Sequence, residues 1–397
     1  MHSHKSERWI IIILALINFV NILDFMIMMP LGPQIKRVFI LGPSQWSTVV
    51  ASYTFAAFIS GILSIFVIDK FDRKRLLLIV LIGFIVGTFL CGIANSYNTM
   101  ILARAVAGFF GGVLSSLVLA IVGDVIPFER RSSAMGAVMA GFSAAAALGV
   151  PFGLYFGTKF GWQLPFYVAA IFSVFILILA YYKIPFINSH LLLNKNSKPL
   201  LVVKEILLSR NKLTGFIFMA LIILGQFLII PFLSPYMVAN VGFKEEQLTL
   251  IYLIGGLFTV FSGPIIGKLS DRYSNQKVFM ILMLISLIPI VVITHLGNTS
   301  IPVVLIFTSM FFVFAGGRMI PAMSLVMATA EPRLRGVFMS IRSAIQQIAS
   351  GLAATISGKI IIEASNKHYM HYNWVGFLAI ACSLGSGYLL YRFKADN

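Results

Sequence analysis

Charged residues are scarce in this chain: they make up 11% of its 397 residues, whereas hydrophobic residues make up 59%. A soluble domain carries about 25% charged residues. A chain this apolar cannot present a polar surface to water, and apolar runs of about 20 residues recur along it. These observations exclude an ordinary soluble protein and predict an all-α membrane protein.

Acidic residues are the scarcest charged group, with 13 Asp and Glu against 30 Lys and Arg, and only Asp24 lies well inside an apolar run. The six histidines lie in tails, loops or span ends. A membrane-embedded enzyme would need clustered His, Asp or Glu, or a nucleophile beside a base, so we do not expect an enzyme. The two cysteines, Cys91 and Cys382, lie in apolar runs, so we expect neither a disulfide framework nor a metal site.

Twelve apolar runs divide into two groups of six. They fall near 9–29, 47–68, 76–94, 100–123, 134–157 and 164–182, and then near 214–238, 248–267, 278–297, 301–328, 337–362 and 374–391. The first run is as long as a full span and lacks a small-residue cleavage site, so we expect it to be retained rather than removed as a signal peptide. Each group of six predicts one helical unit.

The polar stretch between the groups divides the chain into residues 1–185, a cytoplasmic linker at 186–213, and residues 214–397. Its segment VVKEILLSRNK (202–212) fits either a short amphipathic helix on the membrane surface or a solvated loop. With the N-terminus inside, 21 Lys and Arg lie on the cytoplasmic side and six outside, which predicts that both termini are cytoplasmic. The net charge of +17 is therefore ascribed to cytoplasmic loops, and no nucleic-acid partner is expected.

The two groups resemble repeats of each other. VIDKFDRKR (67–75) matches LSDRYSNQK (269–277) at an offset of 202, and RSSAMG (131–136) matches RGVFMS (335–340) at an offset of 204. Repeated halves that face a central site are an architecture of transporters, which rock one half against the other. The repeat therefore predicts two pseudo-symmetric six-helix bundles.

Several short motifs identify a family resemblance. The loop residues Ile65, Val67, Asp69, Lys70, Asp72, Arg73 and Lys74 resemble the signature G-x-L-x-D-[RK]-x-G-R-[RK] of the Major Facilitator Superfamily, with Ile65 and Asp72 in place of its glycines. The second copy, which contains Asp271, keeps the first Gly as Gly267. Arg104 and Gly108 resemble the R-x-x-x-G motif, and Gly149, Pro151 and Gly153 resemble the helix-5 motif of the twelve-helix drug:proton antiporters, with the order of Gly and Pro shifted.

The resemblance implies a conformational latch at the signature loop. In the family, the Asp of this loop contacts the N-terminus of a helix in the other half, where free N–H groups favour an anion. For Asp69 that partner is the start of helix 11, near Gly336, while Arg73 is expected to pair with Asp124. The alternative is that these are ordinary loop charges that set the topology.

Proton coupling is expected to involve Asp24 and Arg104. A carboxylate deep in a span is costly and therefore suggests function, and Arg104 lies at a similar depth on a helix that lines the cavity in the resembled fold. Polar and aromatic residues expected to line that cavity are Asn21, Tyr53, Gln226, Tyr236, Arg318 and Gln346. For Arg318 three partners remain open: helix carbonyls, Asp24 across the cavity, or an anionic group on the substrate.

The function predicted is a secondary active transporter of the cytoplasmic (inner) membrane. It exports small drug- or metabolite-like compounds in exchange for protons by alternating access, as multidrug-resistance pumps do. The alternative is a proton-coupled symporter that imports a sugar or an organic anion. The sequence contains no G-x-x-x-x-G-K-[ST] phosphate loop, so we expect no cofactor and a proton gradient as the driving force. The expected partners are the lipid bilayer, protons and a small-molecule substrate, for a monomer.

Overall fold

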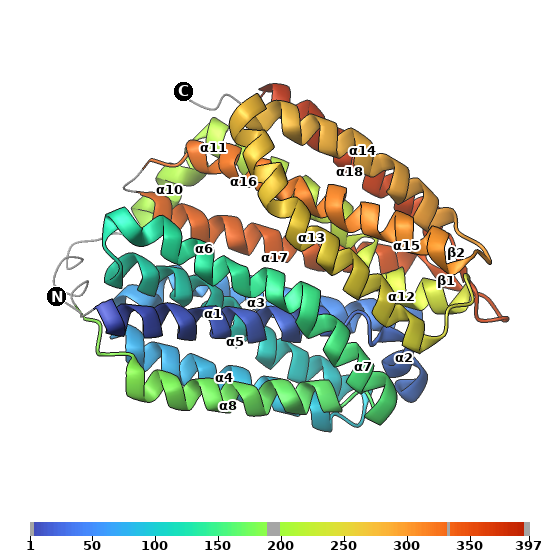
Figure 1. Cartoon of the computed structure of the whole chain (residues 1–397), viewed down its shortest axis with the longest axis horizontal. Coiled ribbons are helices and arrows are strands. Elements are labelled where there is room, and N and C mark those ends of the chain that lie inside the picture. The colour runs from blue at the N-terminus through green and yellow to red at the C-terminus, as the bar shows by residue number, and fades with distance from the viewer. Residues whose placement is uncertain (1–3, 189–198, 332–333, 393–397) are drawn as a thin grey trace.

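The computed structural model describes residues 4–188, 199–331 and 334–392, and nearly all of them are helical. The first half comprises α1 (His4–Ile27), α2 (Gly32–Phe39), α3 (Pro43–Val67), η1 (Ile68–Lys70), α4 (Arg73–Ile93), α5 (Tyr97–Val125), α6 (Phe128–Ala144), the π-helical η2 (Ala145–Gly149), α7 (Val150–Phe160) and α8 (Leu164–Lys183). This half occupies the lower part of Figure 1.

The second half follows α10 (Pro199–Leu208). It comprises α11 (Arg210–Phe227), α12 (Ile230–Ala239), α13 (Glu245–Tyr273), α14 (Asn275–His295), α15 (Ile301–Met310), the π-helical η3 (Phe311–Gly316), α16 (Met319–Ala328), α17 (Arg335–Ile360), the strands β1 (Ile362–Glu363) and β2 (Tyr369–Met370), and α18 (Tyr372–Arg392). The two strands, each of two residues, pair antiparallel and form a hairpin. Residues 189–198 of the predicted linker lie outside the described residues.

Eleven helices in the described part of the chain are long and apolar enough to cross a membrane. Four of these spans combine shorter elements: α3 with η1, α6 with η2 and α7, α11 with α12, and α15 with η3 and α16. The twelfth long helix, α17, has 26 residues, which is also enough for a span of about 20. It is more polar than the others because it contains Arg342 and Gln346. The predicted all-α, two-bundle membrane fold is confirmed.

Local sequence explains where the helices begin. Proline occupies the first turn of α2, α3, α8, α12 and α15, where its missing N–H is not needed. The hydroxyl of Ser96 caps α5 by accepting from the Thr99 backbone N–H. Pro235 inside α12 has no N–H to donate to the Pro231 carbonyl, which accepts a hydrogen bond from the Trp46 indole instead. The Ile229 carbonyl, at the break between α11 and α12, accepts from the Tyr372 hydroxyl.

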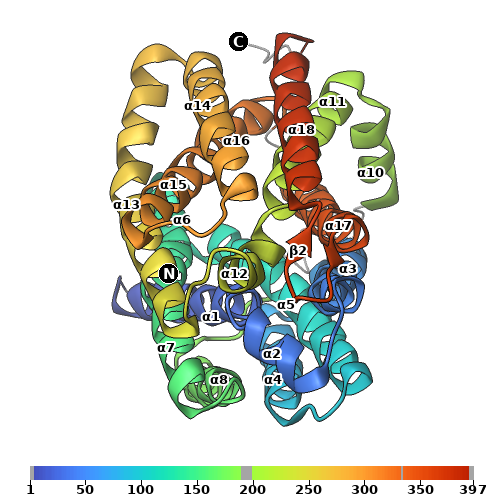
Figure 2. The same ribbon diagram turned by 90° about the vertical axis from the view of Figure 1, so that its right-hand side faces the viewer.

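The two ends of the bundle differ in how the halves meet. At the end that carries α2 and the β-hairpin, here called the hairpin end, one hydrophobic cluster runs from Ile27 and Trp46 of the first half to Phe232 and Tyr372 of the second. Figure 2 looks onto this end, with α2, α12 and β2 near its centre. Toward the other end, here called the linker end, the first half has a cluster of its own, and Ile65 of α3 joins a cluster whose other buried members belong to α10 and the second half. The hairpin end is therefore closed in this structure.

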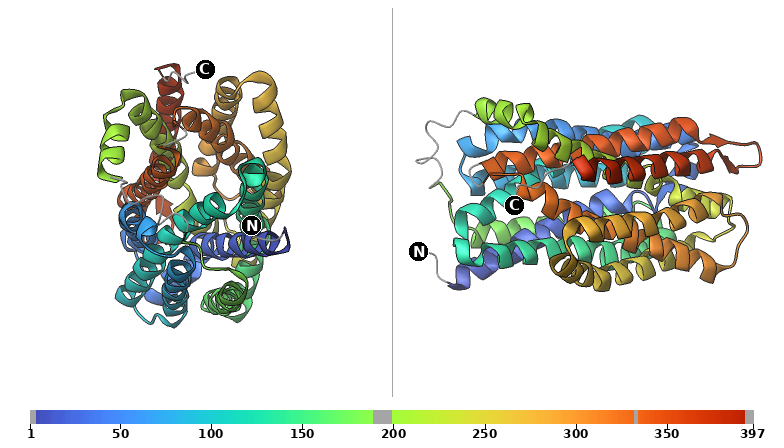
Figure 3. Two further views of the ribbon diagram at one scale, coloured as in Figure 1. Left: turned by 90° about the vertical axis from the view of Figure 1, so that its left-hand side faces the viewer. Right: turned by 90° about the horizontal axis from the view of Figure 1, so that it is seen from above.

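The linker end carries the start of α1, the end of α18 and α10 (Figure 1; left-hand view of Figure 3). The right-hand view of Figure 3 shows the hairpin at the opposite extreme of the molecule. The helix α11 begins at Arg210, four residues before the predicted start of the second unit. The segment predicted as an amphipathic helix or a loop forms part of α10 and the first turn of α11.

Candidate functional site

A buried ion pair connects the first and fourth spans. Asp24 of α1 is 0% exposed and Arg104 of α5 is 1% exposed. The Arg104 Nη1 atom lies 3.0 Å from Asp24 Oδ2 and 3.2 Å from the Asp24 backbone oxygen. The structure therefore brings together the two residues that depth along the helices had matched. Both charges are shielded from solvent, so each depends on the other for compensation.

Aromatic rings cover this pair on the side of the second half. The guanidinium carbon of Arg104 lies 4.4 Å from the ring centroid of Tyr53, within the range of a cation–π interaction. Phe25 lies 5.2 Å from Tyr53, and 5.8 Å from Phe227 of α11, measured between ring centroids. The ion pair is thus separated from α11 by the rings of Tyr53 and Phe25.

A hydrogen-bonded chain holds Tyr53 in position. Its hydroxyl donates to Asn21 Oδ1 over 3.0 Å, and Asn21 Nδ2 donates to the Gly111 backbone oxygen and the Ser115 hydroxyl. This close packing requires glycine on α5: a Cβ at Gly111 would lie 2.6 Å from Asn21 Oδ1, and one at Gly108 would overlap the Tyr53 backbone oxygen. The spacing of Arg104 and Gly108 places both on the helix face toward α3.

The helix-5 motif lies against α1. Gly149 ends the π-helical segment η2, and Pro151 and Gly153 lie in the first turn of α7. A Cβ at Gly149 would lie 3.0 Å from Leu23, and one at Gly153 would lie 2.7 Å from Ile27. The motif residues therefore pack beside the helix that carries Asp24.

Arg318 is fully buried in the second half, between α14 and α18. Its Nη1 atom donates to the hydroxyl oxygens of Ser383 at 2.9 Å and Ser286 at 3.3 Å. Its Nε and Nη2 atoms make no hydrogen bond within the described residues. Asp24 pairs with Arg104 instead, so the cross-cavity pair is not the arrangement found. Arg318 is a buried cation whose partners here are two neutral hydroxyl groups.

The remaining predicted cavity residues do not gather around Arg318 as one polar group. Gln226 is half-buried on α11, and its Nε2 atom is the nearest atom to the space beside Gly316. The Tyr236 hydroxyl donates to the Leu296 backbone oxygen over 2.7 Å. Gln346 accepts from Arg342 Nη1 over 2.7 Å, one turn away on α17.

The signature loop forms a charge cluster within the first half. Arg73 is buried, and its guanidinium donates to Asp69, to Asp124 and to the Ile68 backbone oxygen. Both ion pairs are 2.7 Å long. Asp69 therefore pairs within its own loop in this state, and a Cβ added at Gly336, at the start of α17, would meet no described atom within 4 Å. The counterpart of Asp69 in the second half, Asp271, is exposed at the end of α13.

Asp72, which replaces a glycine of the signature, has a structural role that the sequence analysis missed. Its Oδ1 atom caps α4 by accepting from the Arg75 backbone N–H, and its Oδ2 atom accepts from the Ile187 backbone N–H over 2.8 Å. The preference for Asp at helix N-caps could have indicated this role.

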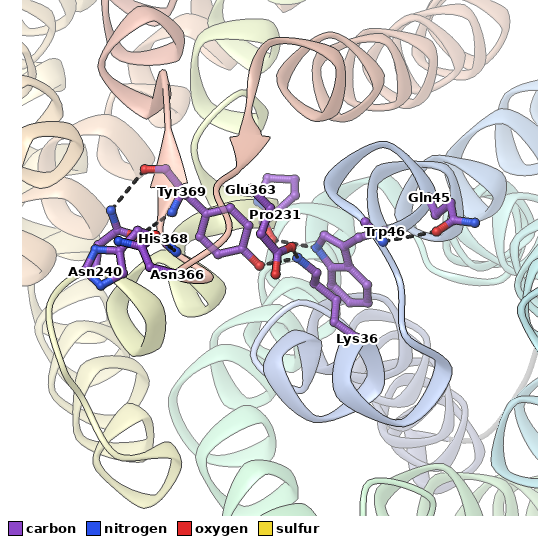
Figure 4. A network of polar contacts seen from close by, with 10 residues as sticks. Lys36, Gln45, Trp46, Pro231, Asn240, Glu363, Asn366, His368 and Tyr369 are labelled. Atoms are coloured by element: carbon purple, nitrogen blue, oxygen red, sulfur yellow. Dashed lines mark hydrogen bonds and ion pairs between the residues drawn. The ribbon is translucent and has the colours of Figure 1, made fainter.

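A second charge cluster, at the hairpin end, was also missed (Figure 4). Lys36 Nζ lies 3.1 Å from Glu363 Oε2 and donates to the Tyr369 hydroxyl. Burial lowers the pKa of Lys36, and the attraction of Glu363 partly offsets this effect. Arg37, the next residue of α2, contacts both carboxylate oxygens of Glu245, at 2.7 and 3.3 Å. Both pairs join the first half to the second.

Within residues 4–188, 199–331 and 334–392, no three His, Cys, Asp or Glu side chains lie close enough together to bind a metal ion.

Comparison with known proteins gives a consistent family. The sequence profile described as Major Facilitator Superfamily matches residues 14–354 and 215–396. The chain is 23% identical over 392 residues to "Uncharacterized MFS-type transporter YbcL" of Bacillus subtilis (strain 168), covering 98% of this chain and 97% of the relative. It is 25% identical to a "Probable sugar efflux transporter" of Mannheimia succiniciproducens, covering 90% of this chain and 88% of that protein.

A solved structure shows the same fold. The crystal structure of a D-xylose-proton symporter superposes with a TM-score of 0.75 at 18% identity, covering 96% of this chain and 97% of that one. At this level of identity the likeness concerns the fold.

Proposed function

Because the chain belongs to the Major Facilitator Superfamily, we propose that it is a secondary active transporter that exports small organic compounds in exchange for protons. It would act in the cytoplasmic membrane as a monomer, with the linker end toward the cytoplasm and a proton gradient in place of any cofactor. The observation that carries the proposal is the buried pair of Asp24 and Arg104.

The pair suits proton coupling for a chemical reason. A carboxyl group can change its charge by binding a proton, whereas a guanidinium remains cationic. When Asp24 is charged it compensates Arg104, and when it is protonated the pair becomes a lone cation that must find another partner. The two protonation states of Asp24 therefore favour different surroundings for Arg104. The rings of Tyr53 and Phe25 adjoin the second half, so a rearrangement of the pair can bias how the halves meet.

Alternating access would use the two ends of the bundle in turn. The present state is closed at the hairpin end, where one hydrophobic cluster is shared by both halves. In the opposite state we propose that Asp69 leaves Arg73 and contacts the start of α17, closing the linker end. That exchange is the latch which the family resemblance implies.

The substrate class proposed is a small organic molecule that is anionic, zwitterionic or rich in hydrogen-bond acceptors. Arg318 supports this, because its Nε and Nη2 atoms lack acceptors among the described residues. A sugar also fits, since hydroxyl and ring oxygens are acceptors and one relative is named a probable sugar efflux transporter. The second candidate function, import of a sugar or organic anion by proton symport, rests on the similarity in fold to a D-xylose-proton symporter.

The direction of coupling separates the two candidates. Purified protein is reconstituted into liposomes with its hairpin end facing the outer solution. The outer solution is then made more acidic than the lumen, so that protons are driven inward. An exporter that exchanges protons for substrate moves labelled compounds out against their gradient, and a symporter moves them in. Asp24→Asn should abolish substrate movement driven by the proton gradient, while the exchange of labelled for unlabelled substrate (counterflow) is retained. Substrate movement whose rate and direction do not change with the proton gradient would overturn the proposal.

A further inference from the structure

Two short elements outside the spans meet across the boundary between the halves at the hairpin end. They are α2 of the first half and the β1–β2 hairpin of the second, shown together in Figure 4. Lys36 of α2 lies against Glu363 and 4.3 Å from the ring centroid of Tyr369, so both hairpin strands contribute to its surroundings. Arg37 extends the contact to Glu245, in the first turn of α13.

The hairpin is fixed to the second half. The Asn240 side-chain amide donates to the Tyr369 backbone oxygen over 3.0 Å, and its oxygen accepts from the Tyr369 backbone N–H over 2.9 Å. This double hydrogen bond joins β2 to the end of α12. A displacement of the second half therefore carries the hairpin with it and pulls directly on Lys36.

Backbone strain gathers in the same elements. Four non-glycine residues in the described chain have a positive φ, and three of them belong here: Ile40 at the end of α2, and Lys367 and His371 on either side of β2. Ile40 is β-branched and 89% exposed, so neither its side chain nor its packing favours this conformation. Strained residues of this kind occur at switch regions, where the surrounding contacts hold them in place.

We propose that α2 and the β1–β2 hairpin form an electrostatic gate that holds the hairpin end closed and releases Lys36 and Arg37 when that end opens. Lys36 is 7% exposed, and a cation buried to this degree is stable only beside its counter-charge. In the open state water would solvate both partners. Closure therefore depends on Glu363 being charged and in place. The gate goes beyond the proposed function, though it rests on the alternating access that function implies.

The test measures how often the hairpin end opens. Ala353 of α17 is 0% exposed within the hydrophobic cluster shared by both halves. Ala353→Cys, in a background with Cys91→Ala and Cys382→Ala, gives a single thiol that a membrane-impermeant maleimide reaches only during opening. When opening is fast relative to labelling, the rate follows the open population. A second reporter, Ala51→Cys on α3, guards against a local effect of the first substitution.

Glu363→Gln leaves Lys36 without its counter-charge and should raise the labelling rate at least about tenfold. Glu245→Gln should raise it by a smaller factor, because Arg37 is exposed and surface pairs are weak. The matched control is Glu246→Gln, the same change at the exposed neighbouring position, which should leave the rate unchanged. Exchanging the charges with Lys36→Glu and Glu363→Lys together should restore slow labelling.

If Glu363→Gln labels at the rate of Glu246→Gln with both reporters, or if the charge exchange labels as fast as Glu363→Gln, the gate proposal is wrong. Labelling needs neither substrate nor a proton gradient. A failure of the gate is therefore distinguishable from a failure of the proposed transport function, which the liposome assay tests.

Discussion

Asp24→Asn tests whether the buried pair stabilises the fold in addition to its proposed role in proton coupling. The two side chains are 0% and 1% exposed, and removing one partner of a buried pair costs about 3–5 kcal/mol. Asparagine keeps an oxygen that can accept from Arg104 Nη1, and the Asp24 backbone oxygen remains 3.2 Å away. The cation–π contact with Tyr53 is also retained. We therefore expect a loss of about 3 kcal/mol, the low end of the range.

The loss can be measured as a change in melting temperature. With an unfolding entropy of about 2.1 cal/mol/K per residue, a chain of 397 residues loses stability at about 0.8 kcal/mol per degree. Asp24→Asn should accordingly lower Tm by about 4 °C in a thermal-shift assay. The matched variant is Arg104→Gln, in which the unpaired group is the Asp24 carboxyl instead of the Arg104 guanidinium.

The two variants should differ in how their thermal stability depends on pH. A lone carboxyl group can become neutral by binding a proton, so Arg104→Gln should be less destabilising at pH 5 than at pH 8. The lone guanidinium of Asp24→Asn stays charged, so its Tm difference from wild type should not recover at acid pH. An unchanged Tm together with full gradient-driven transport by Asp24→Asn would refute both the structural and the coupling role.

Three further predictions concern other charged residues. Arg73→Gln leaves two carboxylates without their shared cation, so it should lower Tm by several degrees, whereas Lys70→Gln, at an exposed neighbour, should not. Arg318→Gln should weaken binding of anionic or zwitterionic compounds about tenfold or more in a charge-varied panel, and a panel in which lipophilic cations bind best to both proteins would contradict this. Lys36→Met removes the buried cation, so Glu363→Gln should raise the maleimide labelling rate much less in the Lys36→Met background than in the wild-type background. Equal factors in the two backgrounds would show that Glu363 acts independently of Lys36.

The sequence was most informative where a rule links residues to depth in the membrane. Span lengths and the internal repeat were sufficient for the membrane fold of about twelve helices in two bundles. Asp24 and Arg104 were matched because each is a rare charge at a similar distance from the same end of its span, and the structure places them 3.0 Å apart. The family signature placed Arg73 beside Asp124 in the same way.

Other contacts left no such signal. The helix α2 has eight residues and each strand has two, too short for a periodic pattern. Lys36 and Glu363 are separated by 327 positions, and nothing local to either residue indicates the other. Arg318 illustrates a different limit: the sequence left helix carbonyls, Asp24 and an anionic substrate group open as its partners, whereas the structure supplies serine hydroxyls, which occur in nearly every span.

The hydrogen bond between the Trp46 indole and the Pro231 carbonyl gives the protein an intrinsic optical reporter. Trp46 is fully buried at the contact between the halves, whereas Trp9 and Trp374 are exposed on the outside of the bundle and Trp162 is buried within the first half. Opening of the hairpin end breaks this bond and brings water to the Trp46 indole. Its fluorescence emission should then move to longer wavelength, and the part of the change that is absent from Trp46→Phe belongs to this indole. The transport cycle can therefore be followed in unlabelled protein, with Trp46→Phe as the blank.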